Sequence, residues 1–178
     1  MNREQLSHVL RAATRITNDP EIIVIGSQAI LGSFDDADLP IEVTLSIEAD
    51  LCFLNDIDDH KSDIVDGSIG ELSSFHEEFG YYAQGVSIMT AILPAGWEDR
   101  VVPYREGDYE PSRADCLDPH DLVVSKLVAG RQKDIEFANA LIKANIISIA
   151  ILKVRAEMLE VPGAVIARVV STLGRLSS

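Results

Sequence analysis

The first residues of the chain carry apolar side chains at helical spacing. These side chains recur three or four positions apart, at Leu6, Val9, Leu10, Ala13 and Ile16. That spacing places them on one face of an amphipathic helix. Asn18, Asp19 and Pro20 follow directly, a combination that ends helices. The pattern predicts a helix over about residues 3–17.

Two short apolar runs then predict buried strands. The first, Glu21–Gly26, is rich in β-branched residues and stops at Gly26-Ser27, as a buried strand would. The second, Ala49–Leu54, carries Asp50 near its start. Between them, Gln28–Leu31 predicts the first turn of a helix, which Gly32–Asp36 interrupts. We expect residues 22–25 and 49–54 to be neighbouring strands of one sheet.

The middle of the chain predicts a helix followed by a meander of strands. Ile64–Phe79 places apolar residues on one helical face. Three short strands are expected after it, separated by Gly85 and by Pro94-Ala95-Gly96: Tyr81–Gln84, Val86–Leu93 and Arg100–Tyr104. Ile41–Thr44 fits no single pattern.

The pattern becomes helical from Asp118-Pro119 onward. Four helices are expected there, at about 119–129, 131–144, 147–159 and 164–176. The order of elements predicts an α+β or α/β fold, with a mixed sheet flanked by helices. We divide it into a core over residues 1–117 and a helical segment over 118–178 that packs on the core.

Charge is distributed unevenly over the 178 residues. The formal net charge is -14, from 15 basic and 29 acidic side chains. Residues 1–119 hold 7 basic and 24 acidic side chains, a balance of -17, whereas residues 120–178 hold 8 and 5, a balance of +3. This balance argues against broad, charge-driven binding to nucleic acid or anionic membranes, although a local basic groove stays open.

The apolar stretches are short and the cysteines few. The longest, Ile22–Ile25 and Ile146–Leu152, fall well short of the roughly 20 residues of a membrane-spanning helix. The polar N-terminal stretch lacks the pattern of a secretory signal, so we expect a cytoplasmic protein. Cys52 and Cys116 stand far apart and indicate neither a disulfide framework nor a zinc site.

Two features suggest a site for a metal-bound triphosphate. Glu48 and Asp50 are two residues apart, so on a strand both project from one face, where paired carboxylates can hold Mg²⁺. Gly26 and Ser27 lead from a strand into a helix start, where backbone N–H groups and a hydroxyl can cradle phosphate. The alternative is a solvated acidic edge beside an ordinary strand-to-helix turn.

The order of these parts resembles a known signature. The segments I-V-I-G-S-Q-A-I (23–30) and S-I-E-A-D-L (46–51) resemble the DNA polymerase beta-like nucleotidyltransferase superfamily. The later segment H-D-L-V-V-S-K-L-V-A-G-R-Q-K-D (120–134) is similar to the Lys…Arg-x-Lys-Asp element of its AbiEii-type branch, which includes toxins of toxin–antitoxin and phage-abortive systems. The resemblance covers about residues 20–140 and implies a nucleotidyltransferase-like sheet.

The resemblance also implies roles for individual residues. Gly26 and Ser27 would contact nucleotide phosphates, and Glu48 and Asp50 would hold Mg²⁺ and form the catalytic pair. The nucleotide would further meet the C-terminal motif, which is Lys126, Arg131, Lys133 and Asp134. Basic side chains in this half could neutralise a triphosphate. The alternative is that Lys126, Arg131 and Asp134 merely join two helices and pair locally.

Two departures from the family pattern bear on activity. Glu48 stands where the family usually has Asp, and Ser87 stands in the segment Val86–Thr90 where a third carboxylate is expected. Glu98 or Asp99 could supply that acid, but a turn at Pro94–Trp97 separates them from the segment.

Three classes of function remain open. The first is metal-dependent nucleotidyl transfer from an NTP to a hydroxyl on RNA or protein. The second is a catalytically inactive module that binds a nucleotide or a partner. The third is an interaction protein that forms a homo-oligomer through its apolar helices after residue 145. An antitoxin-like protein partner is implied by the resemblance alone.

Overall fold

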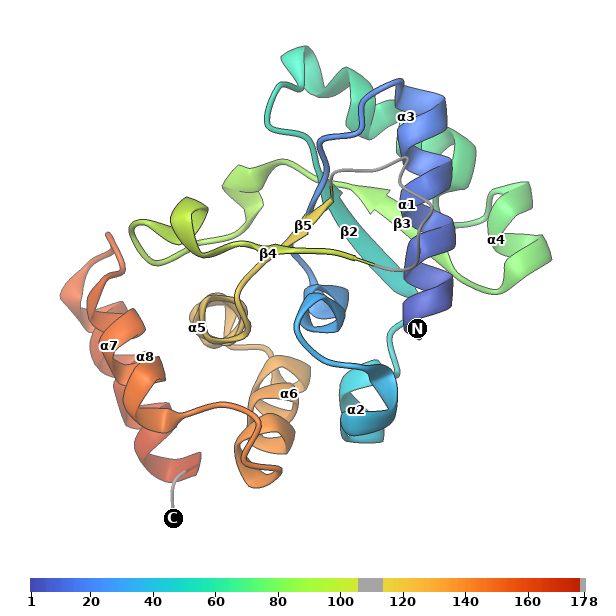
Figure 1. The fold of residues 1–178 in the computed structure, drawn as a ribbon. Helices are drawn as coiled ribbons and strands as arrows, with labels where there is room; N and C mark the ends of the chain where they lie inside the picture. The colour runs from blue at the N-terminus through green and yellow to red at the C-terminus, as the bar shows by residue number, and fades with distance from the viewer. Residues whose placement is uncertain (106–113, 177–178) are drawn as a thin grey trace.

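The computed structural model describes residues 1–105 and 114–176. Its strands form a mixed sheet in the order β3-β2-β1-β5-β4 (Figure 1). In chain order the strands are β1 (Ile23–Val24), β2 (Glu48–Cys52), β3 (Tyr82–Gly85), β4 (Val102–Pro103) and β5 (Asp115–Cys116). β1 runs antiparallel to β2 and parallel to β5, β2 runs parallel to β3, and β4 runs antiparallel to β5. The predicted mixed sheet, with 22–25 beside 49–54, is confirmed.

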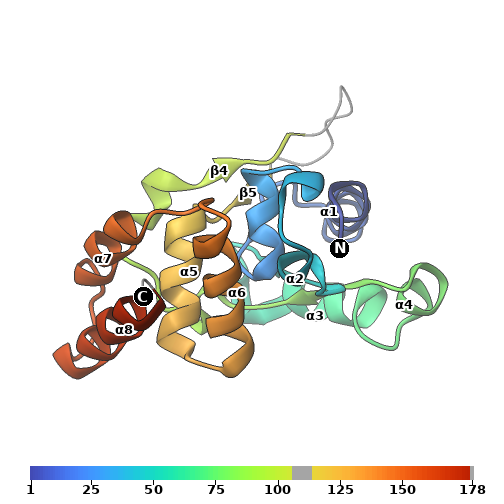
Figure 2. The same cartoon turned by 90° about the horizontal axis from the view of Figure 1, so that it is seen from below.

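Helices lie on both sides of the sheet. The α-helices are α1 (Arg3–Thr17), α2 (Ile41–Thr44), α3 (His60–Ile69), α4 (Ser74–Phe79), α5 (Pro119–Ala129), α6 (Gln132–Lys143), α7 (Ile149–Glu157) and α8 (Gly163–Leu176). Short 3₁₀ turns are η1 (Ser27–Gly32), η2 (Asp36–Asp38), η3 (Ile57–Asp59), η4 (Ile88–Thr90) and η5 (Trp97–Arg100). α1 and α3 pack on each other and on β3, whereas α5 packs on η1 and on α6, α7 and α8 (Figures 1 and 2).

The helices with the clearest sequence signals form where expected. α1 covers residues 3–17, starts at a capping box between Asn2 and Gln5, and ends at Asn18 in the left-handed conformation. These local bonds satisfy backbone groups that a helix end leaves open. α5 to α8 match the four predicted C-terminal helices within a few residues. The division at residues 117 and 118 stays a prediction.

The helix predicted over Ile64–Phe79 is wrong as a single element. α3 ends at Ile69 because Gly70 is extended, and a Cβ there would lie 2.2 Å from the Asp66 carbonyl oxygen. α4 then starts separately, with the Ser73 side chain accepting a bond from the His76 backbone N–H. Local capping chemistry therefore overrides the longer apolar pattern.

The predicted strand over Val86–Leu93 and the meander are also wrong. β3 ends at Gly85, and the Ser87 side chain then caps the η4 turn by accepting from the Met89 N–H. β3 and β4 lie at opposite edges of the sheet, so they do not pair. Of the strand predicted at Arg100–Tyr104, only Val102–Pro103 forms. The two-residue strand β5 was not predicted, because two residues carry no readable period.

The core joins all of these elements. Side chains from α1, β1, η1, β2 and the C-terminal helices are less than 2% exposed, including Leu6, Leu10, Ile22, Ile30, Leu31, Leu51, Leu122, Leu141, Leu152 and Leu173. α5 is buried on most of its surface, which fits its place between η1 and the later helices. Over the described ranges, every helix is too short or too polar to cross a membrane.

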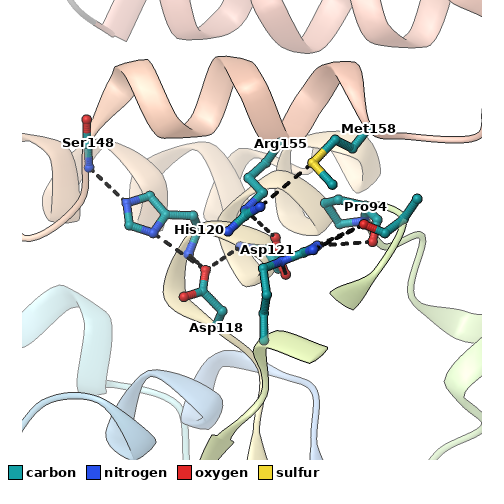
Figure 3. A network of polar contacts seen from close by, with 9 residues as sticks. Pro94, Asp118, His120, Asp121, Ser148, Arg155 and Met158 are labelled. Atoms are coloured by element: carbon teal, nitrogen blue, oxygen red, sulfur yellow. Dashed lines mark hydrogen bonds and ion pairs between the residues drawn. The ribbon is translucent and has the colours of Figure 1, made fainter. Parts of the chain in front are cut away.

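A buried ion cluster ties the C-terminal helices to the loop before β4. The Asp121 side chain on α5 is 1% exposed and lies 2.7 Å from Arg100 Nε and 3.2 Å from Arg155 Nε. Arg100 also donates to the carbonyls of Pro94 and Ala95. Beside it, Asp118 caps α5, and His120 accepts from the Ser148 N–H at 3.1 Å (Figure 3). One carboxylate thus links η5, α5 and α7.

Replacing Asp121 with Ala should therefore destabilise the fold strongly. The change leaves two arginines, whose side chains are only 17% and 22% exposed, without their shared buried carboxylate. Breaking a buried ion pair by removing one partner costs about 3–5 kcal/mol. Denaturant unfolding measures the loss. Asp35→Asn is the control, because its exposed pair with Arg3 should contribute at most about 1 kcal/mol. Equal losses for the two variants would contradict a structural role for the Asp121 cluster.

Candidate functional site

The site begins where β1 and β2 pair. Val24 lies opposite Leu51, and the Ile25 N–H donates to the Asp50 carbonyl at 3.1 Å. Gly26 therefore comes next to the Asp50 side chain. A Cβ built on Gly26 would lie 1.5 Å from Asp50 Oδ2, so the carboxylate occupies the space that any other residue would fill. The glycine is required by this close approach.

Glu48 and Asp50 act on each other. The pKa of Asp50 is raised to about 6. Burial is the largest cause, the charge of Glu48 and a hydrogen bond to it act in the same direction, and the charges of Lys126 and Lys133 oppose them. Two close carboxylates resist ionising together. Glu48 also accepts a 3.3 Å bond from the Tyr82 hydroxyl on β3, where burial and the nearby acids raise the pKa of Tyr82 to about 12. The pair is therefore electrostatically suited to a cation.

Lys126 reaches the Gly26-Ser27 turn from α5. Its Nζ donates to Ser27 Oγ at 2.9 Å and lies 3.5 Å from Asp134 Oδ1. It also lies 4.8 Å from the centre of the Phe137 ring, a cation–π contact. Burial lowers the pKa of Lys126, although Asp134 and Asp50 act in the opposite direction. Packing of α5 on η1 thus places a buried cation at the predicted phosphate turn.

Arg131 and Asp134 form the other half of this contact. Arg131 Nε donates to Asp134 Oδ2 at 2.7 Å, and Nη2 donates to Oδ1 at 3.3 Å. Burial alone would raise the pKa of Asp134, but the Arg131 bond and the Lys126 charge bring it below its usual value. The Asp134 side chain is 1% exposed, whereas that of Arg131 is 61% exposed. Asp134 therefore orients two cations.

A pocket of about 360 Å³ gathers four of the predicted residues. Gly26, Asp50, Lys126 and Arg131 line its polar part. Its other walls come from α5 and from the segment after β3, and include Val86, Ala91, Ile92, Leu122, Val128 and Ala129. A negative group, two positive groups and an apolar wall thus face one space.

The other predicted residues lie around neighbouring hollows. Ser27, Lys133 and Asp134 line a second pocket of about 630 Å³ between α2 and α6, which Lys126 also lines. Glu48 lines a third, of about 350 Å³, together with Asp66, Glu71, Tyr82 and Gln84. The structure therefore brings most of the predicted set to the two sides of Lys126, and places Glu48 at an acidic edge.

A third acid for the pair comes neither from the segment Val86–Thr90 nor from Glu98 or Asp99. Ser87 caps η4, and Glu98 and Asp99 are exposed in η5 and do not line the pocket. Over residues 1–105 and 114–176, no three His, Cys, Asp or Glu side chains gather as a metal cluster. The pair of Glu48 and Asp50 is the carboxylate set that the described residues offer here.

Sequence reasoning missed the residues that shape the pocket. Thr90, Ala91 and Ile92 line it, but they fall in the segment that was predicted as a strand. Ser125 also lines it, and only its place next to Lys126 on a helix could have indicated this. Tyr82 was predicted as part of a strand, yet its contact with Glu48 depends on the parallel register of β2 and β3.

Comparison with known proteins places the chain in a family. Neither the curated proteins nor the solved structures that were compared show a significant match to this chain. A family model described as "Nucleotidyltransferase of unknown function (DUF6036)" matches residues 4–166. That range holds both β1 with its Gly26-Ser27 turn and the Lys126–Asp134 segment. The chain belongs to this nucleotidyltransferase family.

Proposed function

We propose that the chain binds an NTP with Mg²⁺ in the 360 Å³ pocket and transfers its nucleotidyl group to a hydroxyl. One observation carries the proposal: the Asp50 carboxylate and the cations of Lys126 and Arg131 line the same pocket. A metal-bound triphosphate needs both kinds of group, and its transfer depends mainly on positioning and charge neutralisation. The family supports a nucleotide substrate.

The carboxylate pair suits Mg²⁺ by its chemistry. Mg²⁺ prefers oxygen ligands and is usually bound through one or two carboxylates plus waters and substrate phosphates. Glu48 and Asp50 supply two carboxylates, and the raised pKa of Asp50 reflects its burial beside the charge of Glu48. When bound, Mg²⁺ would neutralise phosphate charge and polarise the phosphoryl group. Glu48 and Asp50 would hold it.

The remaining groups divide the nucleotide between them. Lys126 is held at Ser27 by a 2.9 Å bond, and Asp134 orients Arg131, so both cations are preorganised for phosphate oxygens. Lys133 lies beyond Lys126 in the second pocket and would extend the positive charge along the phosphates. The apolar wall formed by Val86, Ile92 and α5 provides a surface for the nucleobase.

The transfer itself is a displacement at the α-phosphorus. An acceptor hydroxyl oxygen would bond to the α-phosphorus, the bond to the β-phosphate oxygen would break, and pyrophosphate would leave. The proton of the hydroxyl would pass to water, since neither Ser87, Glu98 nor Asp99 provides a base in the pocket. RNA and protein are the two acceptor classes. Membership of the AbiEii-type branch and an antitoxin-like partner stay predictions.

The lack of a third acid among the described residues favours a second candidate, a module that binds nucleotide without transfer. Each α-³²P-labelled NTP is incubated with the protein, Mg²⁺ and a mixed pool of tRNA and protein. Label transferred to the pool supports the transferase. Nucleotide binding by calorimetry without label transfer supports the binding module. Absence of both label transfer and nucleotide binding would contradict both candidates.

Asp50→Asn should separate a site residue from a structural one. The change keeps the shape of the side chain but removes a metal-binding charge, so Mg²⁺-dependent nucleotide affinity should fall at least about tenfold. The melting temperature should stay equal or rise, because repulsion with Glu48 disappears. Calorimetry and thermal unfolding measure both. Asp63→Asn, exposed on α3, is the control. Lower stability with unchanged affinity would reject the metal site.

Gly26→Ala should damage the same site through shape. The added Cβ overlaps the Asp50 carboxylate and must displace it, so Mg²⁺-dependent affinity should fall as in Asp50→Asn. Overpacking should also cost about 1–3 kcal/mol of stability. Gly67→Ala is the matched control, because a Cβ at that position on α3 meets nothing within 4 Å. Unchanged metal-dependent binding in Gly26→Ala would show that the position of Asp50 is unimportant.

The raised pKa of Asp50 predicts a pH dependence with a definite sign. The folded state holds this proton more tightly than the unfolded chain, so ionising Asp50 lowers stability as pH rises from about 4 through about 6. Metal-free wild type and Asp50→Asn should be similar near pH 4. At pH 7 the Asn variant should be more stable, by on the order of 1–3 kcal/mol. Denaturant unfolding in EDTA at both pH values tests this, and a constant difference would contradict it.

A further inference from the structure

Gln28 is a fully buried amide beside the phosphate turn. It follows Ser27 in η1, its exposed fraction is 0%, and it is among the largest fully buried side chains of the structure. The others in that group are apolar leucines and isoleucines. A buried amide is unfavourable unless it is hydrogen-bonded, so its contacts should explain its presence.

Half of the Gln28 amide is bonded. Nε2 donates to the Ser46 carbonyl at 2.9 Å, whereas Oε1 has no hydrogen-bond partner among the described residues. The nitrogen must face Ser46, because a carbonyl accepts and cannot donate. Methionine would fill a similar volume without leaving a buried oxygen unpaired. For stability alone, the amide is a poor choice at this position.

The bonded half leads directly to the carboxylate pair. Ser46 lies two residues before Glu48, and its hydroxyl accepts from the Glu48 N–H and donates to the Glu48 carbonyl, each at 3.3 Å. The Met1 ammonium donates to the same Ser46 carbonyl at 2.7 Å. Gln28 in η1 therefore holds the segment that leads into β2. The Ser46 hydroxyl in that segment bonds to both backbone polar groups of Glu48, the first residue of β2.

We infer that Gln28 is a positioning residue that couples the phosphate turn to the carboxylate strand. Ser27, the neighbour of Gln28 in η1, accepts a hydrogen bond from Lys126. The Gln28 amide fixes the segment that carries Glu48. The inference rests on the proposed function, since it assigns Gln28 to the alignment of the metal-binding pair with the phosphate-binding groups. Gln28 itself lines neither pocket beside Lys126.

The test compares Gln28→Met with Thr14→Val in the full chain, with any purification tag at the C-terminus so that Met1 keeps its contact. Thr14 Oγ1 on α1 is also buried without a partner, but Thr14 lines none of the three pockets. Affinity for the tightest-binding of ATP, GTP, CTP and UTP is measured by calorimetry with Mg²⁺ and with EDTA. Thermal unfolding, and hydrogen exchange of the Glu48 amide in the free protein, are measured alongside.

The expected pattern is specific to positioning. Gln28→Met should lose about tenfold in affinity with Mg²⁺ and little in EDTA, exchange the Glu48 amide faster, and melt at an equal or higher temperature. Thr14→Val should also melt at an equal or higher temperature, with nucleotide affinity unchanged. If Gln28→Met fails to fold, Ser46→Ala is tested instead, because it keeps the carbonyl but loses the hydroxyl beside Glu48. Its nucleotide affinity should fall by the same factor in the presence of Mg²⁺ and change little in EDTA.

The other outcomes overturn the inference in distinguishable ways. If the wild type binds nucleotide with Mg²⁺ and Gln28→Met binds it with the same affinity, the role of Gln28 is rejected and the proposed function is left intact. A lower melting temperature with unchanged affinity assigns Gln28 a purely structural role. Absence of Mg²⁺-dependent nucleotide binding in the wild type rejects the proposed function, and the inference with it.

Discussion

The antiparallel pairing of β1 with β2 is the constraint on which the candidate site depends. The bond from Ile25 N–H to the Asp50 carbonyl aligns the end of one strand with the carboxylate of the other. Side chains alternate along a strand, so this register also decides which face Glu48 and Asp50 share. A shift of one residue would turn both carboxylates to the opposite face. The Asp50 carboxylate would then no longer fill the space beside Gly26, and that position would no longer require glycine.

The second requirement is a cation delivered from the other half of the chain. Burying a lysine is costly unless opposite charge compensates it, and Lys126 is only 11% exposed. Asp134 and Asp50 favour its charged form, while α5 packs on η1 and holds it at Ser27. The acidic first 119 residues and the more basic remainder therefore meet at one place. The charge asymmetry of the sequence has a local counterpart in this contact.

The parts of the fold that could be predicted have strong local signals. α1 has both its apolar period and its caps, and β1 has consecutive β-branched residues. β5 and η4 could not be predicted, because a two-residue strand has no period and the Ser87 cap redirects an apolar run. For the site, motif order brought Gly26, Asp50, Lys126 and Arg131 together. The pairing of Asp134 with two cations and the contact of Glu48 with Tyr82 depend on tertiary packing, which motif order does not encode.

The charge of the nearest partners separates Asp50 from the carboxylate of the structural ion cluster. Asp121 is buried between two arginines of opposite charge, although Asp121 Oδ1 and Arg155 Nε form an ion pair without a hydrogen bond. Asp50 instead faces Glu48, and Gln28 leaves a buried oxygen unpaired. Both therefore lower the stability of the free protein. A ligand that binds only the folded state adds stability in proportion to its affinity. A dication at the carboxylate pair would remove the repulsion at its source, so folding and metal binding would be coupled at this one strand.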